Sequence, residues 1–156
     1  HGAGKDTLIR AANFFIAHIH HVFTVRTLKY LIKGGRLSRF KGTAGEFLDM
    51  KPVLIVDRDG ALSVLKTVRG RKKSLKSLVE YVEEHVSDPS RQIMGICHGE
   101  DRESLEFTEE MLLSAVQPRE LVETVLGCAI GAHTGRGIIG IVFFDALDDE
   151  FEAYVG

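Results

Sequence analysis

Two glycine-flanked segments place single polar side chains where they could bind an anion. Arg36 follows a pair of glycines at positions 34 and 35, and His133 and Thr134 stand in the run Gly131-Ala-His-Thr-Gly-Arg-Gly137. An imidazole and a hydroxyl can donate hydrogen bonds to a carboxylate, and a guanidinium can bind one through two parallel hydrogen bonds. We expect both segments to be loops that a neighbouring helix or strand holds in place. Together they predict a site for a small anionic group.

Each of these segments also has a purely structural interpretation. His133 could be a turn histidine that caps nearby carbonyl groups, and Arg36 could be an exposed arginine that follows a helix cap. The glycine pair needs no ligand to explain it, because a glycine with left-handed backbone commonly ends a helix. The residues alone leave both interpretations open.

A basic run in the middle of the chain has three interpretations. Its members are Lys66, Arg69, Arg71, Lys72, Lys73 and Lys76. They could be a solvated strand end and helix start, a nucleic-acid patch, or a docking surface for an acidic or phosphate-handling protein. No aromatic residues are interleaved with them, and the whole chain carries a net charge of −2, which argues against nucleic acid.

The sequence contains no recognisable catalytic or metal-binding constellation. There is no Gly-x-Ser-x-Gly element, and the start Gly2-Ala-Gly-Lys5 is too short for a phosphate-binding loop. His18 and His21 would lie one turn apart on a helix, but no carboxylate or cysteine stands nearby at ligand spacing, so no metal site is predicted. These absences favour a binding protein without a cofactor over an enzyme.

Composition predicts one soluble globular domain. Apolar residues make up 44 % of the 156 residues and charged residues 27 %, which is ordinary for a packed core with a hydrated surface. The two cysteines, Cys97 and Cys128, stand in apolar strand-like runs and are predicted to be buried free thiols. The apolar run 125–132 is too short to span a membrane, and the chain shows no signal-peptide pattern, so we expect a cytoplasmic protein.

Hydrophobic periodicity predicts an alternation of helices and strands. Expected helices cover residues 5–20, 26–33, 38–49, 71–86 and 102–115. Expected strands cover residues 22–25, 53–57, 61–68, 91–97, 120–127 and 138–144. The turn Asp59-Gly60 between two of these strands indicates a hairpin. Hairpins mixed with helical connections favour an α+β fold, a sheet with helices packed mainly on one face.

Four segments in register resemble the DegV family of fatty-acid-binding proteins. They are Thr27-Leu28 with Gly34-Gly35-Arg36, then Met50-Lys-Pro-Val-Leu54, then Val68-Arg-Gly-Arg-Lys-Lys73, and finally His133-Thr134-Gly135. The resemblance covers nearly the whole chain. One position departs from it, because Arg136 stands where the family's His-Thr-Gly-Pro-Gly loop has proline.

The resemblance implies a domain organisation and a set of ligand-binding residues. Residues 1–20 would form a helix that connects to a missing N-terminal α/β domain. Residues 21–156 would be a lipid-binding domain like the family's C-terminal one, a two-layer α/β unit with a mixed sheet. A long-chain fatty acid would lie between the two domains, with its carboxylate held by His133, Thr134 and Gly135, and by Arg36.

The resemblance also implies a partner and a role. Such proteins are bacterial carriers that present the bound acid to a separate ATP-dependent kinase, which makes acyl phosphate for phospholipid synthesis. Arg69 and Arg71 would belong to the docking surface for that kinase. The isolated domain would expose half of an apolar tunnel, so we expect it to self-associate. The alternative is the substrate-binding subunit of a dihydroxyacetone-kinase-like enzyme, in which His133 would bind a small ketone covalently.

Overall fold

The computed structural model describes residues 2–36 and 50–151, and the predicted helix over 38–49 lies outside them. The helices are α1 (Lys5–His18), α2 (Lys29–Lys33), α3 (Arg71–His85), α4 (Arg102–Ala115) and α5 (Cys128–Thr134), with a short 3-10 turn, η1 (Pro89–Arg91). The strands are β1 (Ile19–Thr24), β2 (Met50–Val56), β3 (Leu62–Arg69), β4 (Ile93–His98), β5 (Glu120–Val125) and β6 (Ile139–Phe144).

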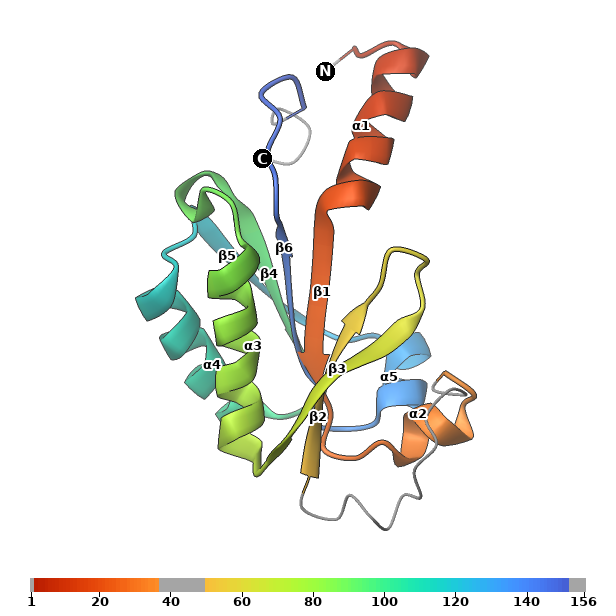
Figure 1. The fold of residues 1–156 in the computed structure, drawn as a ribbon, viewed down its shortest axis with the longest axis vertical. Coiled ribbons are helices and arrows are strands. Elements are labelled where there is room, and N and C mark those ends of the chain that lie inside the picture. The colour runs from red at the N-terminus through yellow and green to blue at the C-terminus, as the bar shows by residue number, and fades with distance from the viewer. Residues whose placement is uncertain (1, 37–49, 152–156) are drawn as a thin grey trace.

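The six strands within the described residues form one mixed sheet (Figure 1) in the order β3-β2-β1-β6-β4-β5. Every pair is antiparallel except β4 and β5, which run parallel and are joined by α4. A parallel pair needs such a crossover, whereas β2 and β3 need only the tight turn that Asp57 and Gly60 close. The predicted α+β fold with a mixed sheet is confirmed.

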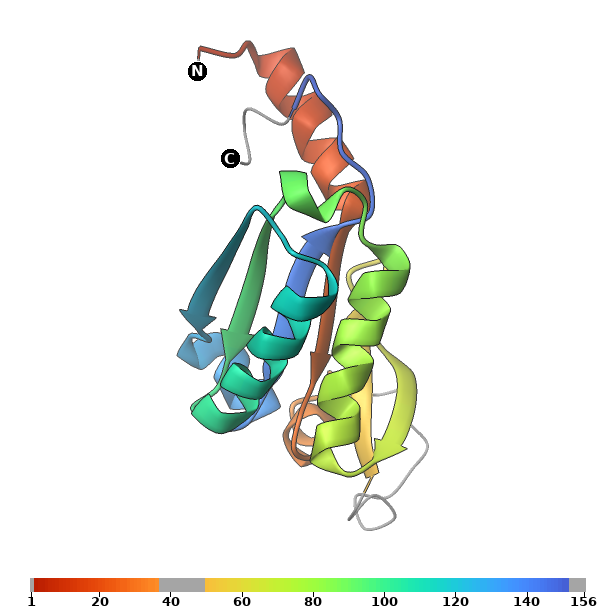
Figure 2. The same ribbon diagram turned by 90° about the vertical axis from the view of Figure 1, so that its left-hand side faces the viewer.

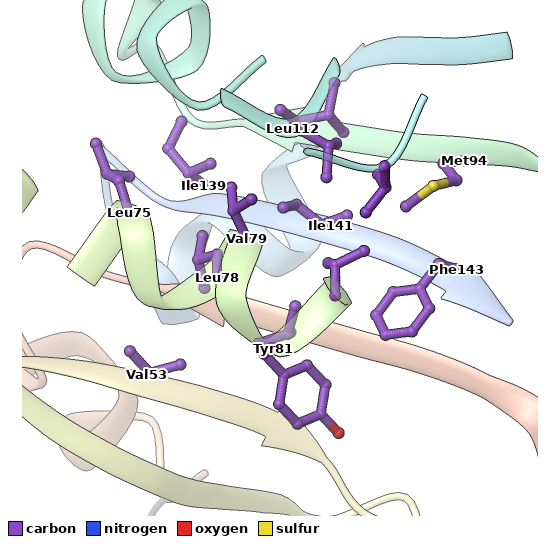
Figure 3. Close-up of a cluster of buried hydrophobic side chains, with 14 of the residues drawn as sticks. Val53, Leu75, Leu78, Val79, Tyr81, Met94, Leu112, Ile139, Ile141 and Phe143 are labelled. Carbon is purple, nitrogen blue, oxygen red and sulfur yellow. The ribbon is translucent and has the colours of Figure 1, made fainter. Parts of the chain in front are cut away.

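Helices α3 and α4 cover one face of the sheet, and Figure 2 looks onto this helical layer. Leu75, Leu78 and Val82 of α3 are buried against Val22 of β1 and Ile141 of β6. Figure 3 shows Leu75 and Leu78 of α3 and Ile141 of β6 between the helix and the strands. The spacing of apolar residues that predicted α3 therefore identifies its buried face correctly. In α4, the apolar spacing predicts that Leu105, Leu112 and Ala115 face inward; Leu105 and Leu112 are buried, but Ala115 is exposed.

A second, smaller core lies on the other face of the sheet. Its buried members are Phe23, Val25, Leu28, Leu31, Leu54 and Ile138. The two short helices α2 and α5 contact each other on this side (Figure 1), far apart in sequence but adjacent in space. Among residues 2–36 and 50–151, no helix longer than α5 covers the rest of this second face.

Helix α1 ends earlier than predicted. It stops at His18, and the chain passes directly into β1, so that α1 projects beyond the sheet in continuation of that strand (Figure 1). Phe14 and Phe15 of α1 pack on Phe151, which anchors the helix to the segment after β6. Leu8 and Ile16 of this helix remain exposed, at 51 % and 72 %.

Candidate functional site

Helix α2 ends in a cap that the glycine pair predicted. The N–H of Arg36 donates to the Leu31 carbonyl at 2.9 Å, and the N–H of Gly35 donates to the Ile32 carbonyl at 3.0 Å. Gly35 has φ +70°, the left-handed conformation that this Schellman arrangement requires. Gly34 has φ −81°, so left-handed geometry does not explain why a glycine stands there.

The segment with His133 is a helix, not the predicted loop. Residues Cys128–Thr134 form α5, which begins after Gly127 and ends at Gly135. The expectation that Cys128 is buried in a strand-like run is therefore wrong, because it is the exposed first residue of this helix. Cys97 is half-buried in β4, and both thiols are free.

Two glycines let α2 and α5 approach each other closely. A Cβ atom added to Gly34 would overlap Nδ1 of His133 and lie 3.2 Å from its Cε1 atom. A Cβ atom on Gly135 would lie 2.5 Å from Cδ2 of Tyr30 in α2. Each helix thus ends in a glycine on which a ring of the other helix packs. The imidazole of His133 packs on Gly34, and the ring of Tyr30 packs on Gly135. The imidazole of His133 is positioned by this packing.

His133, Thr134 and Arg36 all line one cavity of about 550 Å³. Most of the other lining side chains are apolar; they include Phe23, Leu31, Val56, Leu62, Leu126, Ile130, Ile138 and Val142. The predicted ligand-binding residues are thus brought together, with the exception of Gly135, which stands beside the cavity and packs on Tyr30. Such a volume and such a lining are typical of a site for a small, mainly apolar molecule.

The side chains of His133, Thr134 and Arg36 differ in how much of their hydrogen-bonding capacity is free for a ligand. The Thr134 hydroxyl donates to the Ile130 carbonyl at 3.1 Å, and the residue is only 4 % exposed. An Nη1 hydrogen of Arg36 donates to the Gly34 carbonyl at 2.9 Å, which leaves the rest of its exposed guanidinium available. In this arrangement His133 and Arg36 can donate hydrogen bonds to a carboxylate. Thr134 can donate to one only after its hydrogen bond to the Ile130 carbonyl breaks.

Arg71 points into the molecule. Its Nη2 atom donates to Asp101 at 3.1 Å and to the Gly137 carbonyl at 2.5 Å, and its Nε atom donates to Ser104 at 3.2 Å. The side chain is only 18 % exposed, and burial lowers the pKa of this guanidinium from its usual value. Arg71 therefore braces the segment after α5, while Arg69, at the end of β3, is exposed.

Asp101 lies at the centre of this cluster, where it accepts hydrogen bonds from more than one arginine. Its carboxylate also accepts from Nε and Nη2 of Arg26 at 3.2 and 3.0 Å, and it caps α4 through the N–H of Ser104. Burial acts to raise the pKa of Asp101, but these hydrogen bonds and the two guanidinium charges outweigh it and hold the pKa below the usual range. Arg136, by contrast, forms an exposed ion pair with Glu100 at 2.7 Å.

The histidines near the start of β1 do not lie together on a helix as predicted. His18 ends α1, and its Nδ1 atom lies 2.7 Å from Asp145; His20 in β1 bridges Asp145 and the Tyr81 hydroxyl, at 2.9 Å each. His21 lies on the opposite face of the strand and lines the cavity. The sequence analysis missed this role of His21, although period-two alternation along a strand would have separated it from His20.

Among the described residues, no group of three or more His, Cys, Asp or Glu side chains is arranged to hold a metal ion. None of the helices within 2–36 and 50–151 combines the length and the apolar character needed to cross a membrane.

Residues 1–146 match the model of a family described as "Uncharacterised protein, DegV family". A DegV domain-containing protein of Caldanaerobacter subterraneus subsp. tengcongensis is 32 % identical over 142 residues, which are 91 % of this chain and 50 % of that protein. The chain therefore spans about half the length of this relative.

Solved structures of related proteins show the same fold. A fatty-acid-binding DegV family protein of Streptococcus agalactiae superposes with a TM-score of 0.83 at 29 % identity, covering 94 % of this chain and 51 % of that one. A stearic-acid-binding protein of Eubacterium ventriosum superposes with a TM-score of 0.74 at 27 % identity, covering 92 % and 50 %.

Proposed function

The chain belongs to the DegV family, whose model matches residues 1–146, and on this premise we propose that it binds a long-chain fatty acid. One observation carries the proposal. An apolar cavity of about 550 Å³ holds two hydrogen-bond donors, His133 and Arg36, where α2 meets α5. An apolar space with polar groups at one place suits a molecule with a hydrocarbon tail and an anionic head. Relatives of similar fold are described as fatty-acid-binding or stearic-acid-binding proteins, which supports this choice of ligand.

The tail supplies most of the affinity in this proposal. Each methylene that leaves water contributes about 0.8 kcal/mol, so a long chain gains far more from the apolar lining than its head gains from any single hydrogen bond. Phe23, Leu62 and Val142 come from three different strands and line the cavity. They would contact the tail over much of its length.

The head group is proposed to lie against His133. The packing of its ring on Gly34 fixes the imidazole before a ligand arrives, so that little conformational entropy is lost on binding. Arg36 would add a second, charged donor. Thr134 would join only after its hydroxyl turns from the Ile130 carbonyl, and we assign it the smaller share of the head-group contact.

A second domain is proposed to close the cavity in a protein of full family length. The chain spans about half of its relatives, and the side of the molecule near α5 exposes Val125 and Ile130, at 62 % and 53 %. Leu8 and Ile16 of α1 are exposed in the same way. Apolar surface of this kind is typical of an interface that another part of the protein covers.

We assign the chain the role of a carrier that performs no chemistry itself. A separate, ATP-dependent kinase would phosphorylate the bound carboxylate in the cytoplasm, and the acyl phosphate would enter phospholipid synthesis. Exposed Arg69 would take part in docking that kinase. Arg71 would act indirectly, because its guanidinium braces Gly137 three residues after Thr134.

Native mass spectrometry of the family-length protein, followed by organic extraction, tests the carrier assignment. We expect a long-chain fatty acid that dissociates on denaturation. A small covalent adduct on His133 that survives denaturation would instead favour the dihydroxyacetone-kinase-like alternative. An empty protein that also takes up no added stearate would overturn the proposed function.

A further inference from the structure

His21 introduces an unpartnered polar group into the apolar part of the cavity. It is the third residue of β1, pairs in register with Val142 of β6, and lines the cavity together with Phe23 and Cys97. Within the described part of the chain, no hydrogen bond reaches its imidazole. Its neighbour His20 points to the other face and has both ring nitrogens engaged, by Tyr81 and by Asp145.

The imidazole of His21 is suited to hydrogen bonding without charge. Burial lowers the pKa of His21, and the proximity of His20 lowers it further. At neutral pH the ring is therefore uncharged and offers one N–H donor and one nitrogen acceptor. A neutral imidazole can pair with a hydroxyl or a carbonyl oxygen, and it has no charge to attract a carboxylate.

The position of His21 places it away from the head-group residues. Thr24, at the end of β1 that leads towards α2, stands three positions after His21, which corresponds to about 10 Å along the strand. His133 and Arg36 lie at the α2 end, beside Gly34. A fatty acid anchored there would bring a carbon well inside its chain, not its first few carbons, to His21.

A purely hydrocarbon tail beside His21 would displace water from the imidazole without offering it a hydrogen bond in place of those to water. A binding site with an unpaired polar group discriminates strongly between a ligand that pairs with the group and one that does not. We propose that His21 selects acyl chains that carry a hydroxyl or oxo group near their middle. The inference rests on the proposed fatty-acid-binding function and narrows its ligand class to oxygenated long-chain acids.

Competitive equilibrium binding to the family-length protein tests this inference. The probes are stearic acid and three hydroxystearic acids with the hydroxyl in the first, middle or last third of the chain. We expect the wild type to prefer the mid-chain hydroxy acid over stearic acid by about tenfold or more. His21→Leu should reverse that preference, whereas His21→Asn, which keeps a donor and an acceptor, should retain part of it.

The outcomes separate this inference from the function on which it rests. If stearic and hydroxystearic acids bind equally well to the wild type and to His21→Leu, the selectivity is refuted while the carrier role stands. The selectivity is also refuted if His21→Leu weakens all four acids by the same factor, since His21 would then serve the fold or the domain contact. If none of the acids binds to the wild type, the proposed function itself fails.

Discussion

The imidazole of His133 packs directly on the backbone of Gly34, so closely that a Cβ atom at position 34 would overlap its Nδ1 atom. The contact joins the ends of α2 and α5 and fixes the ring that faces the cavity. It gives the glycine at position 34 a packing role, whereas Gly35 next to it has a conformational one. The first prediction follows from this difference.

Gly34→Ala is expected to displace His133 and to weaken fatty acid binding by about fivefold or more, because overpacking of this kind costs about 1–3 kcal/mol. Gly131→Ala is the matched control. Gly131 also lies at α5, but nothing stands within 4 Å of an added Cβ atom, so this change should leave binding as it is. Isothermal titration with stearate measures both variants. Equal affinities would show that the Gly34 contact does not position the ring.

Gly135→Ala is expected to destabilise the fold by about 2–4 kcal/mol, for two separate reasons. Gly135 has φ +72° and ψ 179°, a region that only glycine occupies readily, and its Cβ atom would press on the ring of Tyr30. Urea unfolding of the variant measures the loss. Adding Tyr30→Ala should recover only the steric part, and full recovery would mean that the backbone conformation carries no strain.

Asp101→Ala is expected to lower the free energy of unfolding by about 3–5 kcal/mol, because it leaves the largely buried guanidinium of Arg71 without its counter-charge. Arg136→Ala removes an ion pair whose arginine side chain is 82 % exposed, and it should change stability by no more than about 1 kcal/mol. Chemical denaturation of the two variants compares a buried with an exposed pair. A similar small effect in both would contradict the bracing role of Asp101.

Asp145 is expected to make the contact between α1 and the sheet sensitive to acid. Burial acts to raise the pKa of Asp145, but hydrogen bonds from His20 and His18 outweigh it, so the folded pKa is depressed. A depressed carboxyl pKa contributes stability that is fully present above the unfolded pKa of about 3.9 and is lost as the pH falls through the folded value.

The corresponding experiment is urea unfolding of wild type and Asp145→Asn between pH 7 and pH 3. The variant should be less stable at neutral pH by about 1–3 kcal/mol, and the difference should shrink below about pH 4. A difference that stays constant down to pH 3 would show that the Asp145 charge plays no part.

Local sequence patterns predicted the long elements well. The interval 102–115 is the interval that α4 occupies, and the buried face of α3 follows the spacing of Leu75, Leu78 and Val82. These helices are long enough to show several turns of apolar periodicity. The hairpin between β2 and β3 was predictable for a similar reason, since a turn through Gly60, which has φ +75°, needs glycine there.

The local structure of the site was harder to predict because it depends on contacts between distant segments. Helix α5 has seven residues, includes Gly131 and begins after Gly127, so its sequence resembles a strand followed by a turn. Its contact with α2 depends on Tyr30 and Gly34, and no local pattern reports that contact. The residue types around His133 predicted an anion site, and they lie beside a cavity, but they did not indicate the helix that carries them.

The most direct test of the fatty-acid-binding account is the equilibrium affinity of the family-length protein for stearate, measured for the wild type, His133→Ala and His85→Ala. His85 lies on α3, where its Nδ1 atom is hydrogen-bonded to the Tyr81 carbonyl at 2.8 Å. It does not line the cavity. The account predicts that His133→Ala weakens binding by about 10- to 100-fold, as expected for a hydrogen bond to a charged group, while His85→Ala binds like the wild type. Wild-type affinity in His133→Ala would contradict it.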